Sequence, residues 1–179
     1  MMFDIEQRVK EARRLFKEEG YNCCQAVVIA YCDIFGIDKK TAASISSGFG
    51  GGMGRMREVC GSVSGMIILA GLLKPAHDPS SKADRTANYA LVQDVAGEFK
   101  QINGSIICRD LLGIGTSGRD NGSASDTGST QSMVESPVPA DRTNEYYKKR
   151  PCEELVGISA RIIGKRILLC EENLLNLQQ

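Results

Sequence analysis

Apolar side chains recur at intervals of three to four residues through most of the chain, which is the spacing of amphipathic helices. Together with Asn, Asp, Gly and Pro residues at the expected ends, this pattern predicts helices over 3–19, 23–35, 38–47, 60–73, 80–102 and 151–172, and a short turn of helix over 108–112. No stretch alternates between apolar and polar residues as a strand would. The sequence therefore predicts an all-α fold, a compact bundle of about five to six helices in one domain over 1–179.

Two segments interrupt the helical pattern. Residues 48–54 read Gly-Phe-Gly-Gly-Gly-Met-Gly, which is too rich in glycine for a helix interior. In residues 115–136, thirteen of the 22 side chains are Gly, Ser or Thr. Such a composition buries too little apolar surface to offset the entropy lost on ordering. We expect a Gly-rich loop at 48–54 and a flexible Gly/Ser-rich insert at 115–136 that the chemistry does not need.

Charge and hydropathy exclude several classes of function. The 22 basic and 22 acidic residues cancel, and we see no basic stripe of the kind that nucleic-acid binding requires. The longest apolar run, 66–73, is far shorter than the ~20 residues of a membrane span. The first ten residues are charged and amphipathic, unlike a secretory signal. We expect a cytoplasmic protein that neither binds nucleic acid nor inserts into membranes.

The seven cysteines fall into two groups. Cys23, Cys60, Cys108 and Cys152 each stand at the start of a predicted helix, where free backbone N–H groups and the helix dipole favour a thiolate. Among them Cys60 has the strongest case for a lowered pKa, because glycines and two arginines precede it. Cys24, Cys32 and Cys170 fall on apolar helix surfaces, as core cysteines do. The sequence does not decide between the neighbours Cys23 and Cys24.

The glycine run has a structural and a chemical interpretation. It lacks both nucleotide-binding patterns, G-x-G-x-x-G and G-x-x-x-x-G-K-[ST]. Gly50, Gly51, Gly52 and Gly54 could instead let the chain pass close to a bulky group, or point several N–H donors at an anion. Arg55 and Arg57 follow directly, and either add positive charge or are solvated. The basic patch at 146–150 is expected to be solvated.

The cysteine and glycine segments together resemble a known family. The matching segments are Gly20-Tyr21-Asn22-Cys23, 47–54, Val59-Cys60-Gly61-Ser62-Val63-Ser64-Gly65, 105–113 and 152–156. They resemble the C_GCAxxG_C_C family of small redox-active proteins, over nearly the whole chain apart from the insert. The resemblance implies four functional cysteines, here Cys23, Cys60, Cys108 and Cys152. Ser62 stands where the family pattern usually has Ala.

The resemblance implies a redox role, and three chemistries remain open. A related domain in split-Soret cytochromes carries an iron–sulfur cluster besides haem, but this chain lacks a C-x-x-C-H haem motif. Four thiolates suit an iron–sulfur cluster, the chemistry that we favour, for electron transfer or redox sensing. The same cysteines could form reversible disulfides without a metal. A zinc site or a structural helical module is the third alternative.

The remaining expectations concern turnover and partners. The only histidine, His77, lies in a predicted loop, so no general base suited to substrate turnover is evident. At most, the chain is an oxidoreductase-type redox protein. A separate redox partner protein is implied but not identified, and a homodimer is a further alternative. The four cysteines are separated by 37, 48 and 44 residues, so only the folded bundle could bring them together.

Overall fold

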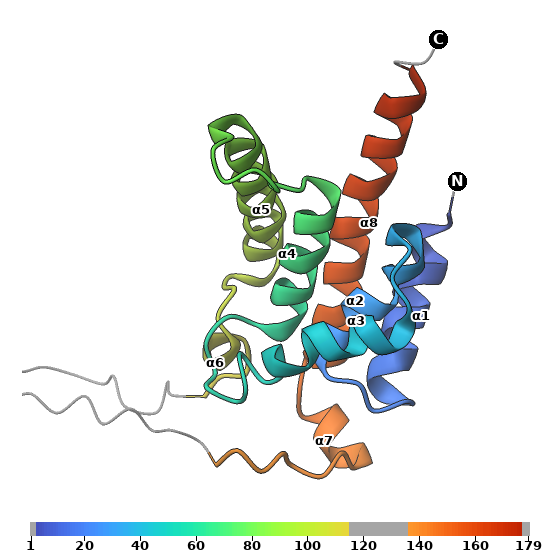
Figure 1. Ribbon diagram of the computed structural model, residues 1–179. Coiled ribbons are helices and arrows are strands. Elements are labelled where there is room, and N and C mark those ends of the chain that lie inside the picture. Colours follow the sequence, from blue (N-terminus) through green and yellow to red (C-terminus); the bar gives the residue numbers. More distant parts are fainter. Residues whose placement is uncertain (1–2, 115–135, 177–179) are drawn as a thin grey trace, which may run out of the picture.

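The computed structural model describes residues 3–114 and 136–176, and these form a bundle of helices (Figure 1). In chain order the elements are α1 (Ile5–Lys17), α2 (Cys23–Ile29), η1 (Cys32–Phe35), α3 (Lys39–Ser46), η2 (Ser47–Phe49), α4 (Gly61–Leu73), α5 (Lys82–Asn103), α6 (Cys108–Leu111), α7 (Asn144–Lys148) and α8 (Cys152–Asn176), where η denotes a 3₁₀ helix. No strand occurs in these residues, and the single β-bridge joins Val59 to Ile107. The all-α prediction is confirmed.

Local signals in the sequence set most helix boundaries. Asn22 caps α2 in a capping box, in which its side chain accepts from the N–H of Gln25 and the Gln25 side chain accepts from the N–H of Asn22. Gly104 follows α5 in the left-handed conformation, with φ of 82°. These caps lie within a few residues of the predicted ends because they depend on neighbouring residues alone.

Three elements differ most from the prediction. The helix expected over 23–35 is two elements, since α2 ends at Ile29 and η1 begins at Cys32. Between them lies Tyr31, which is fully buried and donates a hydrogen bond to the carbonyl oxygen of Ala160 in α8 at 2.8 Å. This contact with a distant helix carries no local sequence signal. The short helix α7 was not predicted, and α8 extends to Asn176 rather than to residue 172.

The apolar helix α4 lies in the middle of the bundle and contacts α2, α5 and α8. Glycine allows the approach of α4 to α2. A Cβ atom on Gly65 would lie 2.9 Å from the Cβ of Val27 and 3.1 Å from the carbonyl oxygen of Cys24. Such distances are too short for a methyl group, so Gly65 lets the backbones of α2 and α4 come together.

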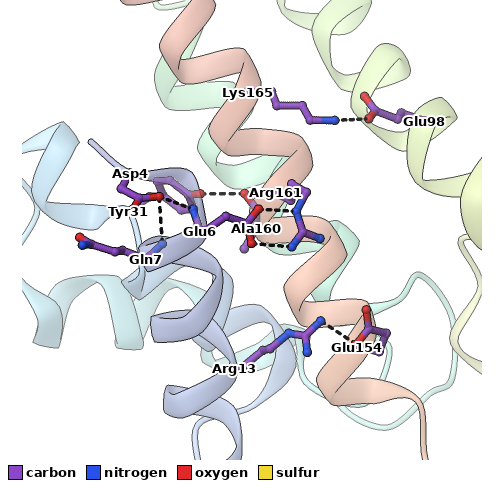
Figure 2. A network of polar contacts seen from close by, with 10 residues as sticks. All are labelled: Asp4, Glu6, Gln7, Arg13, Tyr31, Glu98, Glu154, Ala160, Arg161 and Lys165. Atoms are coloured by element: carbon purple, nitrogen blue, oxygen red, sulfur yellow. Dashed lines mark hydrogen bonds and ion pairs between the residues drawn. The ribbon is translucent and has the colours of Figure 1, made fainter. Parts of the chain in front are cut away.

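Polar contacts on both sides hold α8 in place (Figure 2). Toward α1, Arg161 pairs with Glu6 at 2.7 Å and Glu154 pairs with Arg13 at 2.6 Å. Toward α5, Lys165 lies 3.6 Å from Glu98. Exposed pairs of this kind contribute at most about 1 kcal/mol each, so their main effect is on orientation. They align α8 so that it begins at the end of the bundle where α4 begins and where α6 and α7 lie (Figure 1).

No helix among the described residues is long and apolar enough to cross a bilayer. The flexible insert predicted at 115–136 lies outside the described residues, except for Ser136. The backbone oxygen of Ser136 accepts a hydrogen bond from Nε of Arg55 at 2.8 Å, which ties the start of the second described segment to the glycine-rich loop.

Candidate functional site

The four cysteines at predicted helix starts line one cavity of about 50 Å³. Cys23, Cys108 and Cys152 are the first residues of α2, α6 and α8, and Cys60 directly precedes α4. The other three cysteines are not among the described residues that line this cavity. Cys24 and Cys32 are buried in the core, as expected, and Cys170 is half-buried on α8. The structure thus orients Cys23, rather than Cys24, toward the site.

Backbone hydrogen bonds bring two of these cysteines together. The N–H of Cys60 donates to the carbonyl oxygen of Ile106 at 2.8 Å, and the N–H of Cys108 donates to that of Glu58 at 2.6 Å. The segments before α4 and before α6 therefore run side by side in opposite directions, around the Val59–Ile107 bridge. This short pairing fixes Cys60 and Cys108 on neighbouring backbones.

Glycines supply the space that the thiols occupy. A Cβ on Gly61 would lie 2.7 Å from the Sγ of Cys23, and a Cβ on Gly52 would lie 2.6 Å from the Cβ of Cys108. Both distances are shorter than any real carbon contact, so a side chain at either position would displace a site cysteine. At Gly52, therefore, the glycine run does let the chain pass close to a bulky group, here the side chain of Cys108.

The other glycines of the run differ in their surroundings. Gly51 lines the cavity. A Cβ on Gly50 would lie 2.8 Å from the side chain of Asn22, whereas one on Gly54 would meet no heavy atom closer than 3.8 Å. The carbonyl groups of Gly50, Gly51 and Gly52 accept hydrogen bonds from backbone N–H groups further along the loop. Their role as N–H donors to a bound anion stays a prediction.

The loop winds in the left-handed sense. Residues 51 to 55 all have positive φ, between 61° and 71°, and Arg57 has φ of 61°. Met53, Arg55 and Arg57 bear side chains, for which this conformation costs about 1–2 kcal/mol each. Strain of this kind persists where the surrounding structure fixes it, and it gathers at functional sites. Here the winding carries the chain from Gly51 at the cavity to the buried Arg57, which also lines it.

Burial dominates the electrostatics of the thiols. Removal from water, with a smaller contribution from the nearby Cys23, raises the pKa of Cys60 and of Cys152 to about 12. The expectation that Cys60 has a lowered pKa is therefore wrong, because it did not account for burial. Cys60 is only 5% exposed. Its Sγ lies 3.3 Å from the hydroxyl of Ser62, so the residue at the unusual Ser position contacts a site thiol.

Positive charge partly opposes the effect of burial on the pKa of a site thiol. Burial is the largest influence on Cys108 and raises its pKa, whereas a hydrogen bond from Arg57 lowers it. Arg57 is only 8% exposed. Of the two interpretations of this residue, added positive charge or a solvated side chain, the solvated one is therefore wrong. Loss of a proton from these thiols requires compensating positive charge close by, as guanidinium groups or a bound metal centre supply.

Three residues that follow the insert also line the cavity, and the sequence analysis did not predict them as site residues. Arg142, Tyr146 and Arg150 line it. The Arg150 guanidinium carbon lies 4.7 Å from the centroid of the Tyr146 ring. The basic patch at 146–150 is therefore not simply solvated. Its nearness to Cys152 in sequence was the available signal, since residues just before a helix start share its surroundings.

The four cysteines can be compared with the ligands that zinc and an iron–sulfur cluster require. A zinc ion needs donor atoms that converge to about 2.0–2.3 Å from one point. Among the described side chains, no three His, Cys, Asp or Glu residues are placed to hold one metal ion. Four cysteines around a common cavity are a donor set that suits either a zinc ion or an iron–sulfur cluster, and the ligands of a cluster stand further apart.

Comparison with known proteins agrees with this site. Residues 21–166 match the family model described as "Putative redox-active protein (C_GCAxxG_C_C)", and the chain belongs to this family. The resemblance expected from the cysteine and glycine segments is confirmed. All four cavity cysteines fall within the matched residues. Neither a curated protein nor a solved structure matches the chain.

Proposed function

We propose that the protein holds an iron–sulfur cluster on Cys23, Cys60, Cys108 and Cys152 and acts in electron transfer or redox sensing. One observation carries the proposal: four cysteines from four separate chain segments line the same cavity. The family match, which describes redox-active proteins, agrees with it. Cysteines that served only as small core residues would not be expected to cluster around one cavity.

The residues of the cavity suit an anionic cluster. A bound cluster supplies one-electron chemistry, with a potential set by its surroundings. The guanidinium groups of Arg57 and Arg150 stabilise the negative charge of thiolate ligands. Phe16, Leu111 and Leu155 line the same cavity and exclude water from it. We further propose a separate redox partner protein, because a one-electron site needs a donor and an acceptor.

A reversible disulfide is the second candidate. The proximity of the thiols favours it, since Cys23 influences the pKa of Cys60, of Cys108 and of Cys152. In this chemistry two thiols form one S–S bond and give up two electrons and two protons to an oxidant. A small-molecule disulfide, which is reduced to two thiols, is such an oxidant. It requires two of the cysteines to come within disulfide distance, with Cα atoms less than about 7 Å apart.

Anaerobic purification followed by iron, sulfide and zinc analysis and a visible spectrum tests the proposal. The wild-type protein should contain iron and sulfide and absorb visible light. Cys60→Ser should lose both, and Cys170→Ser, which alters a cysteine outside the cavity, should keep both. Protein without iron that loses thiols in pairs on oxidation would support the disulfide instead. Metal-free protein with unreactive thiols would contradict both candidates.

A further inference from the structure

Ser62 is the second residue of α4 and follows Cys60 by two positions. Its side chain is completely buried and lines the four-cysteine cavity. The hydroxyl oxygen lies 3.3 Å from the Sγ of Cys60, and the two atoms form a hydrogen bond. The start of an otherwise apolar helix thus directs a hydroxyl group at the sulfur of a site cysteine.

Cys60 is the hydrogen-bond partner of the Ser62 hydroxyl in the described part of the chain. Burial keeps this hydroxyl away from bulk water. A serine in a helix often bonds to the carbonyl four residues earlier, but here that carbonyl, of Glu58, accepts from the N–H of Cys108. A buried hydroxyl without a partner costs about 1–3 kcal/mol, so the fold favours the pairing with Cys60.

The state of Cys60 decides which of the two atoms donates. A neutral thiol carries a proton, so either atom can then be the donor. A cysteine that binds a metal centre is a thiolate, which has no proton and can only accept. In protein that holds a cluster, the hydroxyl of Ser62 must therefore donate to the sulfur of Cys60. Hydrogen bonds to a charged acceptor are roughly twice as strong as those between neutral groups.

Ser64, two residues further along α4, makes a different contact with the same cysteine. Its hydroxyl is also buried, but it donates to the backbone carbonyl oxygen of Cys60 at 3.3 Å. Ser64 is not among the described residues that line the cavity. The first turn of α4 thus places one buried hydroxyl at the sulfur of Cys60 and another at its backbone. The two serines form a matched pair for separating these effects.

We propose that Ser62 is a positioning residue of the redox site, whose hydroxyl donates to the sulfur of Cys60 and thereby raises the reduction potential of a cluster bound there. This inference rests on the proposed function and adds to it a residue that is not a ligand. Reduction adds negative charge, part of which the thiolate ligands carry. The hydrogen bond to the sulfur is therefore stronger in the reduced state than in the oxidised state, and it favours reduction.

A redox titration of anaerobically purified protein, followed by visible absorption, tests this proposal. Ser62→Ala removes the donor and should still bind iron and sulfide, because the four cysteines remain. Its midpoint potential should be lower, with a roughly three- to tenfold smaller equilibrium constant for reduction, where tenfold equals about 59 mV for one electron. Ser64→Ala is the control and should change this constant less than about twofold, because a bond to a neutral carbonyl differs little between the two oxidation states.

Iron analysis of the same samples separates the failure of this proposal from that of the proposed function. An unchanged midpoint potential in Ser62→Ala that retains its iron would overturn the role of Ser62 alone. Equal shifts in Ser62→Ala and Ser64→Ala would do so too, since they would indicate a general effect of losing a buried hydroxyl.

Loss of iron from folded Ser62→Ala would also overturn the proposal, because the hydroxyl would then be needed for assembly of the site. Wild-type protein without iron would contradict the proposed function and this inference together. Circular dichroism must show each variant folded, and Ser62→Gly, which also lacks the hydroxyl, gives the same comparison if Ser62→Ala does not fold.

Discussion

A Cβ atom on Gly61 would lie 2.7 Å from the Sγ of Cys23. The first residue of α4 and the first residue of α2 thus form one structural unit, in which the missing side chain of one makes room for the thiol of the other. The carbonyl oxygen of Phe49 would lie 2.8 Å from the same Cβ, so the neighbouring loop also depends on this glycine. Even the smallest side chain at Gly61 has to move either a thiol or the backbone.

Gly61→Ala should therefore disturb the site. Alanine is favoured over glycine in a helix by about 1 kcal/mol, but crowding costs about 1–3 kcal/mol. We expect a lower free energy of unfolding, by roughly 1 kcal/mol, and, if the site holds the proposed cluster, a loss of bound iron. Gly71→Ala in the same helix is the matched control, because a Cβ there meets nothing within 4 Å. It should stabilise by roughly 0.5–1 kcal/mol and keep the iron, as urea unfolding and iron analysis can check.

Gly52→Ala and Gly54→Ala separate crowding from backbone strain. Both glycines have positive φ, 71° and 61°, so alanine costs about 1 kcal/mol at either position. Only at Gly52 would the new Cβ also collide with Cys108, at 2.6 Å. Gly54→Ala should lower stability slightly and leave the thiol chemistry unchanged, whereas Gly52→Ala should alter both. Equal effects of the two variants on thiol reactivity or iron content would contradict the packing described here.

The adjacent Cys23 and Cys24 should behave differently. Cys23 lines the cavity, whereas Cys24 is fully buried in the core, where burial raises the pKa of its thiol. Cys23→Ser should remove the iron or, if the site is a thiol couple, the response to oxidants. Cys24→Ala should keep either property and cost about 1 kcal/mol of stability for the lost sulfur. Iron content, oxidant titration and urea unfolding of both variants give the comparison.

Acid should destabilise the bundle. A hydrogen bond from Arg8 lowers the pKa of Asp33 below its ordinary 3.8, and one from Arg14 lowers that of Glu11 below 4.5. A carboxyl group whose folded-state pKa is lowered stabilises the fold above its unfolded pKa, and this contribution is lost as the pH falls through the folded pKa. The free energy of unfolding should thus decrease below about pH 4.5. Asp33→Asn should show a smaller decrease, and an equal one would exclude this pair as a cause.

The sequence predicted those features that depend on neighbouring residues. Helix caps such as Asn22 act within one turn, and the helix-start position of Cys23 follows from this cap. The family pattern identified the same cysteines. The cavity itself depends on residues far apart in the chain, and the sequence shows them only as separate segments.

Burial explains what the sequence could not predict. The position of Cys60 suggested a stabilised thiolate, but the surrounding helices exclude water and raise its pKa. Arg57 was a candidate for a solvated residue, yet the left-handed winding of the loop buries it. Both outcomes depend on how distant elements pack. For the same reason the contribution of Arg142 to the cavity followed from the structure alone.

The wide spacing of the four cysteines has a consequence for the lifetime of the protein. An unfolded chain holds Cys23 and Cys152 on segments far apart, so a cluster bound by all four thiols recognises only the folded bundle. By mass action, a ligand of the native state adds its binding free energy to that of folding. Oxidative loss of the cluster would then lower the stability of the whole chain. Through this coupling, exposure to oxidants would set how long the protein survives proteolysis.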